Sequence, residues 1–105
     1  MDQEEREKLC PRVQAAFELL GRKWTGLILH QLLEGECSFS DLERTVPSLS
    51  SRMLALRIKE LEAAGLVHRT VVGGPPIRVS YRLTEKGLAL EPAMRGIEEW
   101  AQAWT

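Results

Sequence analysis

The chain has 105 residues, of which 44% are hydrophobic and 28% charged, and its formal net charge is −1. This length supports one modest hydrophobic core, so a single domain is expected over residues 1–105. Because the start of the chain is polar, no signal peptide is expected, and no apolar run is long enough to cross a bilayer. With two cysteines, the chain is predicted to be cytoplasmic, with free thiols.

Two helices are predicted in the first third of the chain. The first begins at Pro11, a residue favoured in the first helical turn, and ends at Leu20. The second spans residues 23–34 and carries apolar residues on nearly every side. Such a helix is expected at the centre of a three-helix core. Residues 1–10 are expected to form a mostly flexible N-terminal arm.

A helix-turn-helix is predicted next. Ser38 is a good N-cap with Asp41 at the third helical position, and Pro47 ends this short helix. Ser50 caps a longer helix over residues 50–64, which a glycine follows. At about 100° per residue, its buried stripe consists of Leu54, Ile58 and Leu61. Its opposite face carries Arg52, Ala55, Leu56 and Lys59. Leu56 is read either as a contact to thymine methyl groups or as a tolerated surface leucine.

An alternating pattern then predicts a two-stranded hairpin. Its strands are expected over residues 66–72 and 78–83, joined by a Gly-Gly-Pro-Pro segment, and Arg78 lies at its shoulder. A helix-turn-helix followed directly by a hairpin is a winged helix-turn-helix, here over residues 38–83. This unit places one helix in the major groove of DNA and the hairpin across the neighbouring backbone. The predicted fold class is α+β, mainly α.

The charges are unevenly distributed along the chain. From Arg44 to Lys86 there are eight basic and three acidic residues, whereas the rest of the chain has six basic and twelve acidic residues. The positive half coincides with the winged half. Charge alone is also typical of a solvated surface, but together with the order of the elements it favours DNA binding.

A final helix is predicted over residues 84–105, with a kink at Pro92. It carries an apolar stripe of Leu88, Met94, Ile97, Trp100, Ala101 and Trp104. This stripe exceeds what a small winged domain covers, so we expect a second copy to cover it, together with Val13 and Phe17 of the first helix. The alternative is that the stripe folds back on the first helix of the same chain.

Several ordered motifs resemble the HxlR family of bacterial winged-helix transcriptional regulators, which are similar to the MarR group. The motifs are Cys10-Pro11, Gly-Arg-Lys-Trp-Thr at 21–25, Phe-Ser-Asp-Leu at 39–42, Ser-Ser-Arg-Met-Leu at 50–54, the run at 57–67, and Tyr-Arg-Leu-Thr-Glu-Lys-Gly at 81–87. The resemblance extends over nearly the whole chain. It implies a homodimer joined through its terminal helices, a recognition helix beginning near Ser50, and repression or activation of a nearby promoter.

The leading hypothesis is a dimeric, sequence-specific regulator that binds a pseudo-palindromic operator in double-stranded DNA. The residues predicted to face the groove are Ser50, Ser51, Arg52, Ala55, Leu56 and Lys59. Ser40, Lys23 and Arg78 are predicted to contact phosphates. The alternative is a winged-helix module that binds protein without specific DNA binding. No residues form a catalytic constellation, so an enzyme is not expected.

The chain has two cysteines, Cys10 and Cys37, whose thiols are candidates for reaction with electrophiles or oxidants. Cys10 precedes a helix and lies near Arg12, which favours a reactive thiolate. The resemblance places Cys10 at the thiol that some family members use to sense electrophiles or oxidants; the alternative is a structural interface cysteine. Cys37 is predicted in the turn before Ser38. No metal site or cofactor is expected, because no Cys-x-x-Cys or close histidine pair occurs. A small ligand is a second candidate effector, although Trp24, Trp100 and Trp104 are read as packing residues.

Overall fold

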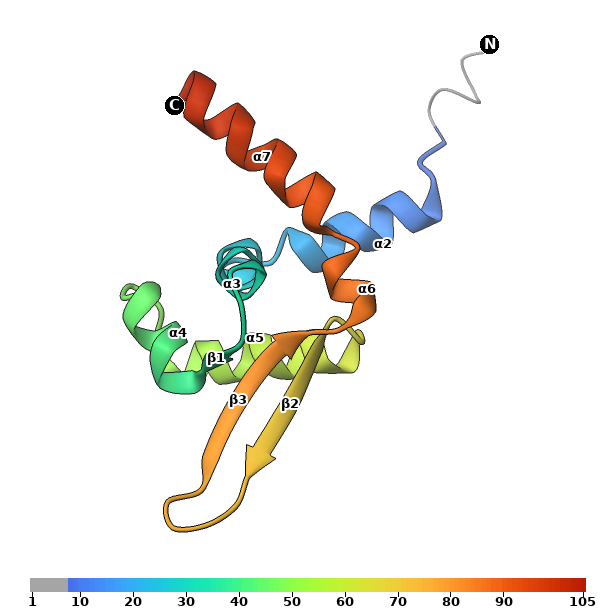
Figure 1. The fold of residues 1–105 in the computed structure, drawn as a ribbon. Helices are drawn as coiled ribbons and strands as arrows, with labels where there is room; N and C mark the ends of the chain where they lie inside the picture. The colour runs from blue at the N-terminus through green and yellow to red at the C-terminus, as the bar shows by residue number, and fades with distance from the viewer. Residues whose placement is uncertain (1–7) are drawn as a thin grey trace.

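The structure is a computed structural model that describes residues 8–105 (Figure 1). Most of the predicted N-terminal arm therefore lies outside the described residues. The elements are α2 (Pro11–Leu20), α3 (Thr25–Leu33), β1 (Cys37–Ser38), α4 (Phe39–Thr45), α5 (Ser51–Ala63), β2 (Val67–Val72), β3 (Arg78–Leu83), α6 (Glu85–Leu88) and α7 (Glu91–Trp104). None of these helices is long and apolar enough to span a bilayer.

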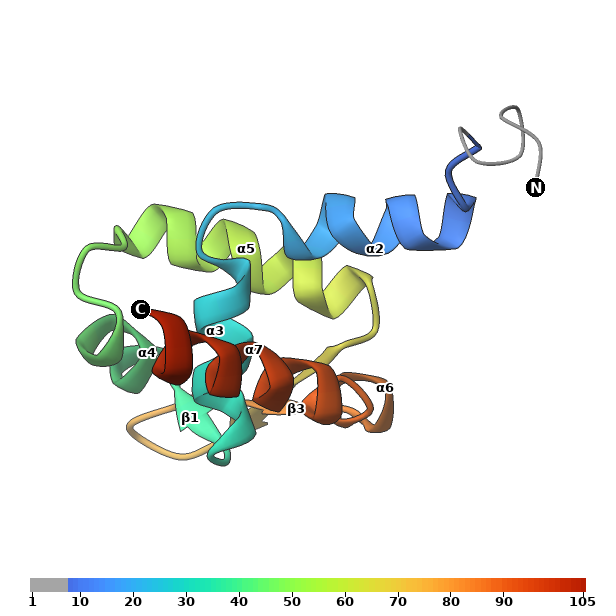
Figure 2. The same cartoon turned by 90° about the horizontal axis from the view of Figure 1, so that it is seen from above.

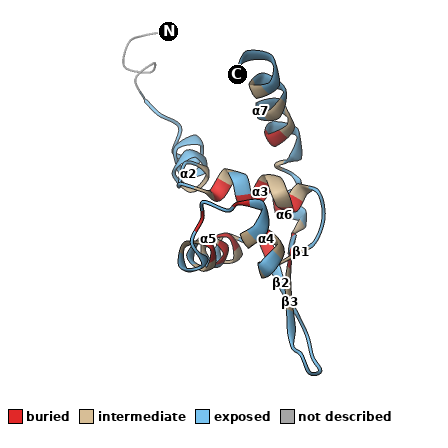
Figure 3. Cartoon of the chain, turned by 90° about the vertical axis from the view of Figure 1, so that its left-hand side faces the viewer, coloured by how far each residue is buried: buried red, intermediate tan, exposed pale blue. Residues whose placement is uncertain are grey.

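The elements are arranged around α3. Helix α5 lies at the base of the body, the β2–β3 hairpin projects beyond it, and α2 and α7 extend on the opposite side (Figures 1 and 3). Viewed from above, α7 crosses over α3 (Figure 2). The winged helix-turn-helix predicted from the sequence is confirmed.

The core lies where α3, α4, α5 and the sheet meet. Its fully buried side chains include Ile28 and Leu29 of α3, Leu42 of α4, and Leu54, Ile58 and Leu61 of α5. Met94 is the member of this cluster that comes from α7. The apolar stripe predicted for α5 is thus confirmed, and α3 is the central helix. It begins two residues later than predicted because Trp24 has a φ of 79°, outside the helical range.

Both helix starts of the helix-turn-helix are capped by serine. The backbone N–H of Asp41 donates to Ser38 Oγ at 3.0 Å, and the N–H of Ser38 donates to Asp41 Oδ2 at 3.0 Å, which completes a capping box. The bond from the Ser38 N–H lowers the pKa of the Asp41 carboxyl. Ser50 caps α5 through the N–H of Met53 at 3.1 Å.

The sheet has three antiparallel strands in the order β1-β3-β2, whereas the sequence analysis predicted only the hairpin. Strand β1 pairs Cys37 with Tyr81 and Ser38 with Ser80. Cys37 therefore lies in a strand, and its prediction as a turn residue is wrong. Two residues are too few to show an alternating pattern, so only the partner strand reveals this element.

The predicted single final helix is also wrong, because two helices occupy this region. Helix α6 ends at Leu88 and α7 begins at Glu91, with Ala89 and Leu90 forming a turn between them. Pro92 lies in the first turn of α7 instead of kinking a continuous helix. Proline has no N–H to donate to the carbonyl of Leu88, so the hydrogen-bond ladder is interrupted here.

Candidate nucleic-acid interface

The outward face of α5 is the surface on which the predicted DNA contacts converge. Arg52, Leu56 and Lys59 are exposed on this face, opposite the buried stripe. Ala55 is half-buried at its margin. Because the opposite stripe packs in the core, this face is turned away from the core. It is long enough and open enough to enter a major groove.

The serines at the start of α5 make local hydrogen bonds. The hydroxyl of Ser50 is the acceptor of the N-cap bond. The hydroxyl of Ser51 donates to the carboxylate of Glu43 in α4. Ser40 lies exposed on α4. Ser50 and Ser51 therefore lie at the start of α5, where Glu43 adds a negative charge, whereas Ser40 lines a pocket with Ile77, Arg78 and Val79 of the hairpin.

An arginine and a glutamate that the sequence analysis did not assign to the site fix the middle of α5. Arg57 donates through Nε to the carbonyl of Lys23 at 2.9 Å and through Nη1 to Glu60 Oε1 at 2.9 Å. Glu60 Oε2 in turn accepts from Arg22 Nη1 at 2.6 Å. These bonds join α5 to the α2–α3 turn across more than 30 residues of sequence. The i, i+3 spacing of Arg57 and Glu60 predicts an ion pair between these two residues. It does not predict their bonds to Lys23 and Arg22.

The C-terminal end of α5 is fixed by residues that follow the hairpin. Thr84 Oγ1 donates to the carbonyl of Gly65 at 2.5 Å, and Lys86 Nζ donates to the carbonyl of Ala64 at 2.7 Å. The bond from Lys86 satisfies a carbonyl group that the helix end leaves unpaired, and the ammonium group complements the negative end of the helix dipole. Lys86, one of the basic residues of the winged half, thus has a structural contact.

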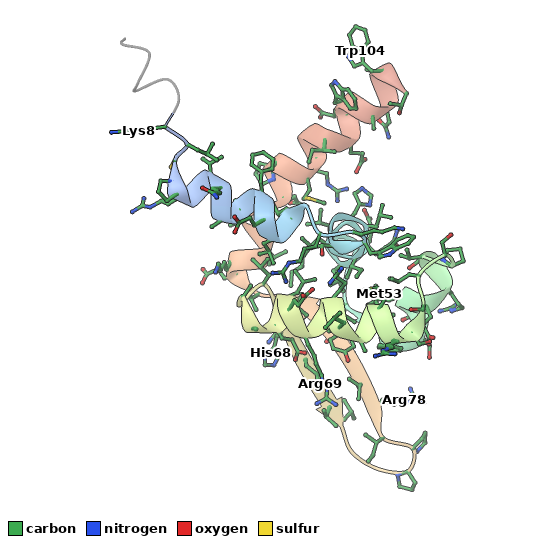
Figure 4. The ribbon with its side chains drawn as sticks, turned by 180° about the vertical axis from the view of Figure 1, so that it is seen from behind. Lys8, Met53, His68, Arg69, Arg78 and Trp104 are labelled. Carbon is green, nitrogen blue, oxygen red and sulfur yellow. The ribbon has the colours of Figure 1, made fainter. Side chains whose placement is uncertain are left out.

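The remaining predicted phosphate contacts lie on either side of α5. Lys23 is exposed in the α2–α3 turn, with its Nζ 5.0 Å from the ring centroid of Trp24. Arg78 begins β3 and is exposed, as are Arg69 and Arg82 on the hairpin. Figure 4 shows Arg69 and Arg78 on the hairpin below α5. Basic side chains therefore flank α5 at the turn and along the hairpin.

The terminal helices carry an uncovered apolar surface. Ile97 and Trp100 are 62% and 60% exposed, and the other exposed members of the predicted interface are Val13, Phe17, Leu88 and Trp104. Met94 differs, because it is 8% exposed and packs in the core. The exposure of the stripe excludes the alternative in which it folds back on α2.

Helix α7 is held to α3 by a polar cluster beside an apolar groove. His30 Nε2 lies 2.7 Å from Glu98 Oε2, and Arg95 Nη1 donates to Glu98 at 3.0 Å and to Glu34 at 3.2 Å. The bonds from His30 and Arg95 lower the pKa of the Glu98 carboxyl. The groove has a volume of about 490 Å³ and is lined by Trp24, Leu27, Met94 and Ile97 among others.

The two cysteines lie in different environments. Cys10 is exposed at the residue that precedes α2. Cys37 is half-buried, and its thiol donates to the carbonyl of Gly35 at 3.4 Å. Burial, and secondarily the negative charge of Asp41, raises the pKa of the Cys37 thiol. Within residues 8–105, no group of three or more His, Cys, Asp or Glu side chains is placed to hold a metal ion.

Comparison with known proteins identifies the family. Residues 19–105 match the model of the HxlR-like helix-turn-helix family. The chain is 44% identical over 97 residues to YvaP, an HTH-type transcriptional regulator of Bacillus subtilis, covering 92% of this chain and 90% of the relative. It is also 44% identical over 93 residues to the regulator YodB of the same organism, covering 89% of this chain and 83% of YodB.

Two solved structures are similar throughout. The reduced form of YodB from B. subtilis aligns with a TM-score of 0.81 at 42% identity, covering 92% of this chain and 95% of that one. The redox regulator HypR in its oxidised form aligns with a TM-score of 0.86 at 38% identity, covering 91% of this chain and 98% of HypR. These relatives are regulators, which confirms the prediction that the chain is not an enzyme. The chain belongs to the HxlR family of helix-turn-helix transcriptional regulators.

Proposed function

We propose that the protein is a sequence-specific DNA-binding regulator that acts as a homodimer, with α5 as its recognition helix. The observation that carries this proposal is the outward face of α5, where Arg52 and Lys59 are exposed while the opposite stripe is fully buried. The helix is held at its start, middle and end by the bonds of Ser50, Arg57 and Lys86. A rigid helix with exposed donors is suited to reading base edges in the major groove.

The proposed dimer follows from the uncovered stripe on α2 and α7. Exposed aromatic and branched side chains gathered on two terminal helices are unusual on a monomer and typical of an interface. A two-fold dimer carries two copies of α5, which read two half-sites about one helical turn apart. We therefore propose a pseudo-palindromic operator in double-stranded DNA as the main partner.

DNA binding is tested by selecting fragments from a random pool with the full chain and measuring affinity over a salt series by fluorescence anisotropy. If the dimer neutralises about six phosphates, affinity is expected to fall by about 10³-fold between 50 and 200 mM salt. A complex with no salt dependence would favour the alternative of a protein-binding module. Failure to enrich any fragment would contradict the proposed function itself.

Base contacts from α5 are tested by Arg52→Ala. We expect this variant to bind the selected fragment about 1–3 kcal/mol more weakly while its loss on random DNA is smaller, because a base contact is made only on the correct sequence. Lys59→Ala tests the next turn of the helix in the same way. Arg12→Ala on α2 removes an equal charge far from α5 and serves as the control. An equal loss on both DNAs would assign Arg52 to phosphate contact.

We further propose that Cys10 is the thiol through which an electrophile or oxidant controls DNA binding. YodB has been solved in reduced, diamide-treated and quinone-bound forms, and HypR in oxidised and reduced forms. In this chain the exposed thiol is Cys10, whereas the raised pKa of Cys37 disfavours the reactive thiolate. Cys10 also adjoins α2, which belongs to the proposed dimer interface.

The role of Cys10 is tested by adding diamide, which is reduced to the hydrazine as it oxidises the Cys10 thiols of the two protomers to a disulfide, or a quinone, whose ring carbon forms a thioether with the thiolate. Wild-type protein is expected to release the selected fragment, and Cys10→Ser is expected to bind normally and stay bound. Cys37→Ser is the matched control and is expected to respond like the wild type. Retention of DNA by wild-type protein after mass spectrometry shows complete modification of Cys10 would make this thiol structural.

A further inference from the structure

A carboxylate lies at the start of α5, although the outward face of this helix presents basic side chains. Glu43 of α4 is half-buried and accepts a hydrogen bond from the hydroxyl of Ser51, the first residue of α5. In a helix-turn-helix, the N-terminal residues of the recognition helix are the ones that contact base edges. The bond to Ser51 therefore holds a carboxylate of the neighbouring helix at the end of α5 where base contacts are expected.

The charge of Glu43 is not neutralised by a neighbouring cation. Within residues 8–105, no lysine, arginine or histidine forms an ion pair with Glu43, and the adjacent Arg44 pairs with Asp41 instead. The hydroxyl of Ser51 fills one of about four acceptor positions of the carboxylate. No other group in the described part of the chain donates a hydrogen bond to it. By contrast, Glu60 in the middle of α5 is paired with two arginines.

An unpaired carboxylate is unfavourable on a surface that approaches DNA, because phosphates carry the same sign of charge. Glu43 therefore contributes to DNA binding only where the DNA offers it a hydrogen-bond donor. Arg52 and Lys59 are exclusively donors and are suited to the acceptor groups of guanine. An ionised glutamate is exclusively an acceptor. It distinguishes bases by a rule opposite to that of the two cations.

The donors that bases present in the major groove are the amino groups at N4 of cytosine and N6 of adenine. In adenine, N6 lies beside the acceptor N7, which would repel the second oxygen of the carboxylate. In cytosine, N4 lies beside a C–H group instead. Guanine and thymine present the acceptors O6, N7 and O4. Cytosine is therefore the base that best accommodates the carboxylate of Glu43.

We propose that Glu43 is a specificity-determining residue, which accepts a hydrogen bond from N4 of one cytosine in each half-site. Ser51 is its positioning residue, because its hydroxyl holds the carboxylate at the start of α5. This inference rests on the proposed DNA binding and names one base that the protein selects. The carboxylate repels phosphates on every sequence but gains a hydrogen bond only at cytosine. It thus weakens binding to random DNA and increases discrimination at one base pair.

The first test compares the fragments that wild-type protein and Glu43→Gln select from the same random pool. Glutamine has a similar size and retains an acceptor for the Ser51 hydroxyl, but it carries no charge. We expect one position in each half-site at which the wild type selects cytosine and the variant does not. Changing that C·G pair to uracil·A in one half-site should weaken wild-type binding about tenfold and variant binding about twofold or less. A loss that is equal in both proteins would belong to another contact and would overturn the proposal.

Glu62→Gln is the matched control, because it removes an equal charge from α5 about three turns beyond Ser51. Both glutamine variants are expected to bind random DNA more tightly than the wild type, since each has one fewer negative charge near the phosphates. Only Glu43→Gln is expected to change the selected base. A control that alters base selection in the same way would assign the effect to charge alone and overturn the proposal.

The second test is Ser51→Ala, which removes the positioning hydroxyl without changing the charge. Discrimination at the same cytosine is expected to fall while affinity for random DNA stays at the wild-type value. Circular dichroism melting checks that the variants are folded, and if Glu43→Gln is not, the discrimination of Ser51→Ala decides. If wild type and both variants select the same bases, Glu43 only links α4 to α5 and this inference fails while the proposed function stands. If the wild type selects no fragment, the proposed function fails first.

Discussion

Gly87→Ala is expected to lower the free energy of unfolding by about 2–4 kcal/mol. A Cβ atom at Gly87 would lie 2.3 Å from the carbonyl oxygen of Leu66 and 3.1 Å from Cδ2 of Leu83. The nearer atom belongs to the backbone that links α5 to β2, so it cannot move aside as a flexible side chain would. Glycine is required here because α6 passes directly against that backbone.

Urea unfolding followed by circular dichroism measures the effect of Gly87→Ala. Gly96→Ala in α7 is the matched control, because a Cβ at Gly96 meets no atom within 4 Å. Alanine is a better helix former than glycine, so the control is expected to gain about 0.5–1 kcal/mol. A Gly87→Ala variant as stable as the wild type would show that α6 shifts away from Leu66 at little cost.

The second large effect is expected at the proposed dimer interface, where Ile97→Asp should raise the dimer dissociation constant by about 100-fold or more. Ile97 is mostly exposed in the single chain, so its replacement leaves the core intact. In a two-fold dimer each interface receives the new carboxylate twice, among Trp100 and Trp104. Burying an unpaired charge among apolar side chains is costly, and the protomers are expected to separate instead.

Sedimentation velocity over a range of concentrations measures this dissociation. Ala103→Asp adds the same charge to an exposed position on another side of α7 and is expected to leave the dimer intact. DNA affinity of Ile97→Asp should fall together with dimerisation, because a single protomer reads one half-site. An Ile97→Asp protein that remains dimeric would place the interface on another surface.

The elements that the sequence predicted correctly are those with local signals. Ser38 and Ser50 mark helix starts because an N-cap acts within three residues, and the buried stripe of α5 follows from helical periodicity alone. The hairpin was predicted for the same reason, since alternation and a glycine-proline segment are local.

The features that the sequence did not reveal depend on distant partners or on backbone geometry. Strand β1 exists because β3 pairs with it, and the bond from Arg57 to the carbonyl of Lys23 joins residues 34 apart. The division into α6 and α7 follows from Pro92, whose effect on a helix depends on whether packing supports a kink or a break. Which of the predicted residues contact DNA stays a prediction, because the bases that are read depend on the sequence of the bound DNA.

The hydrogen bonds of Arg57 couple the position of α5 to that of the α2–α3 turn. Because the α2–α3 turn is hydrogen-bonded to the middle of α5, we expect a displacement of that turn to move the helix with it. A helix of 13 residues is about 20 Å long, so a tilt of about 10° around one end moves the other end by about 3.5 Å. That distance exceeds the length of a hydrogen bond. In the proposed dimer, a rearrangement between protomers that tilts α5 by this amount is expected to break its proposed contacts with the base pairs.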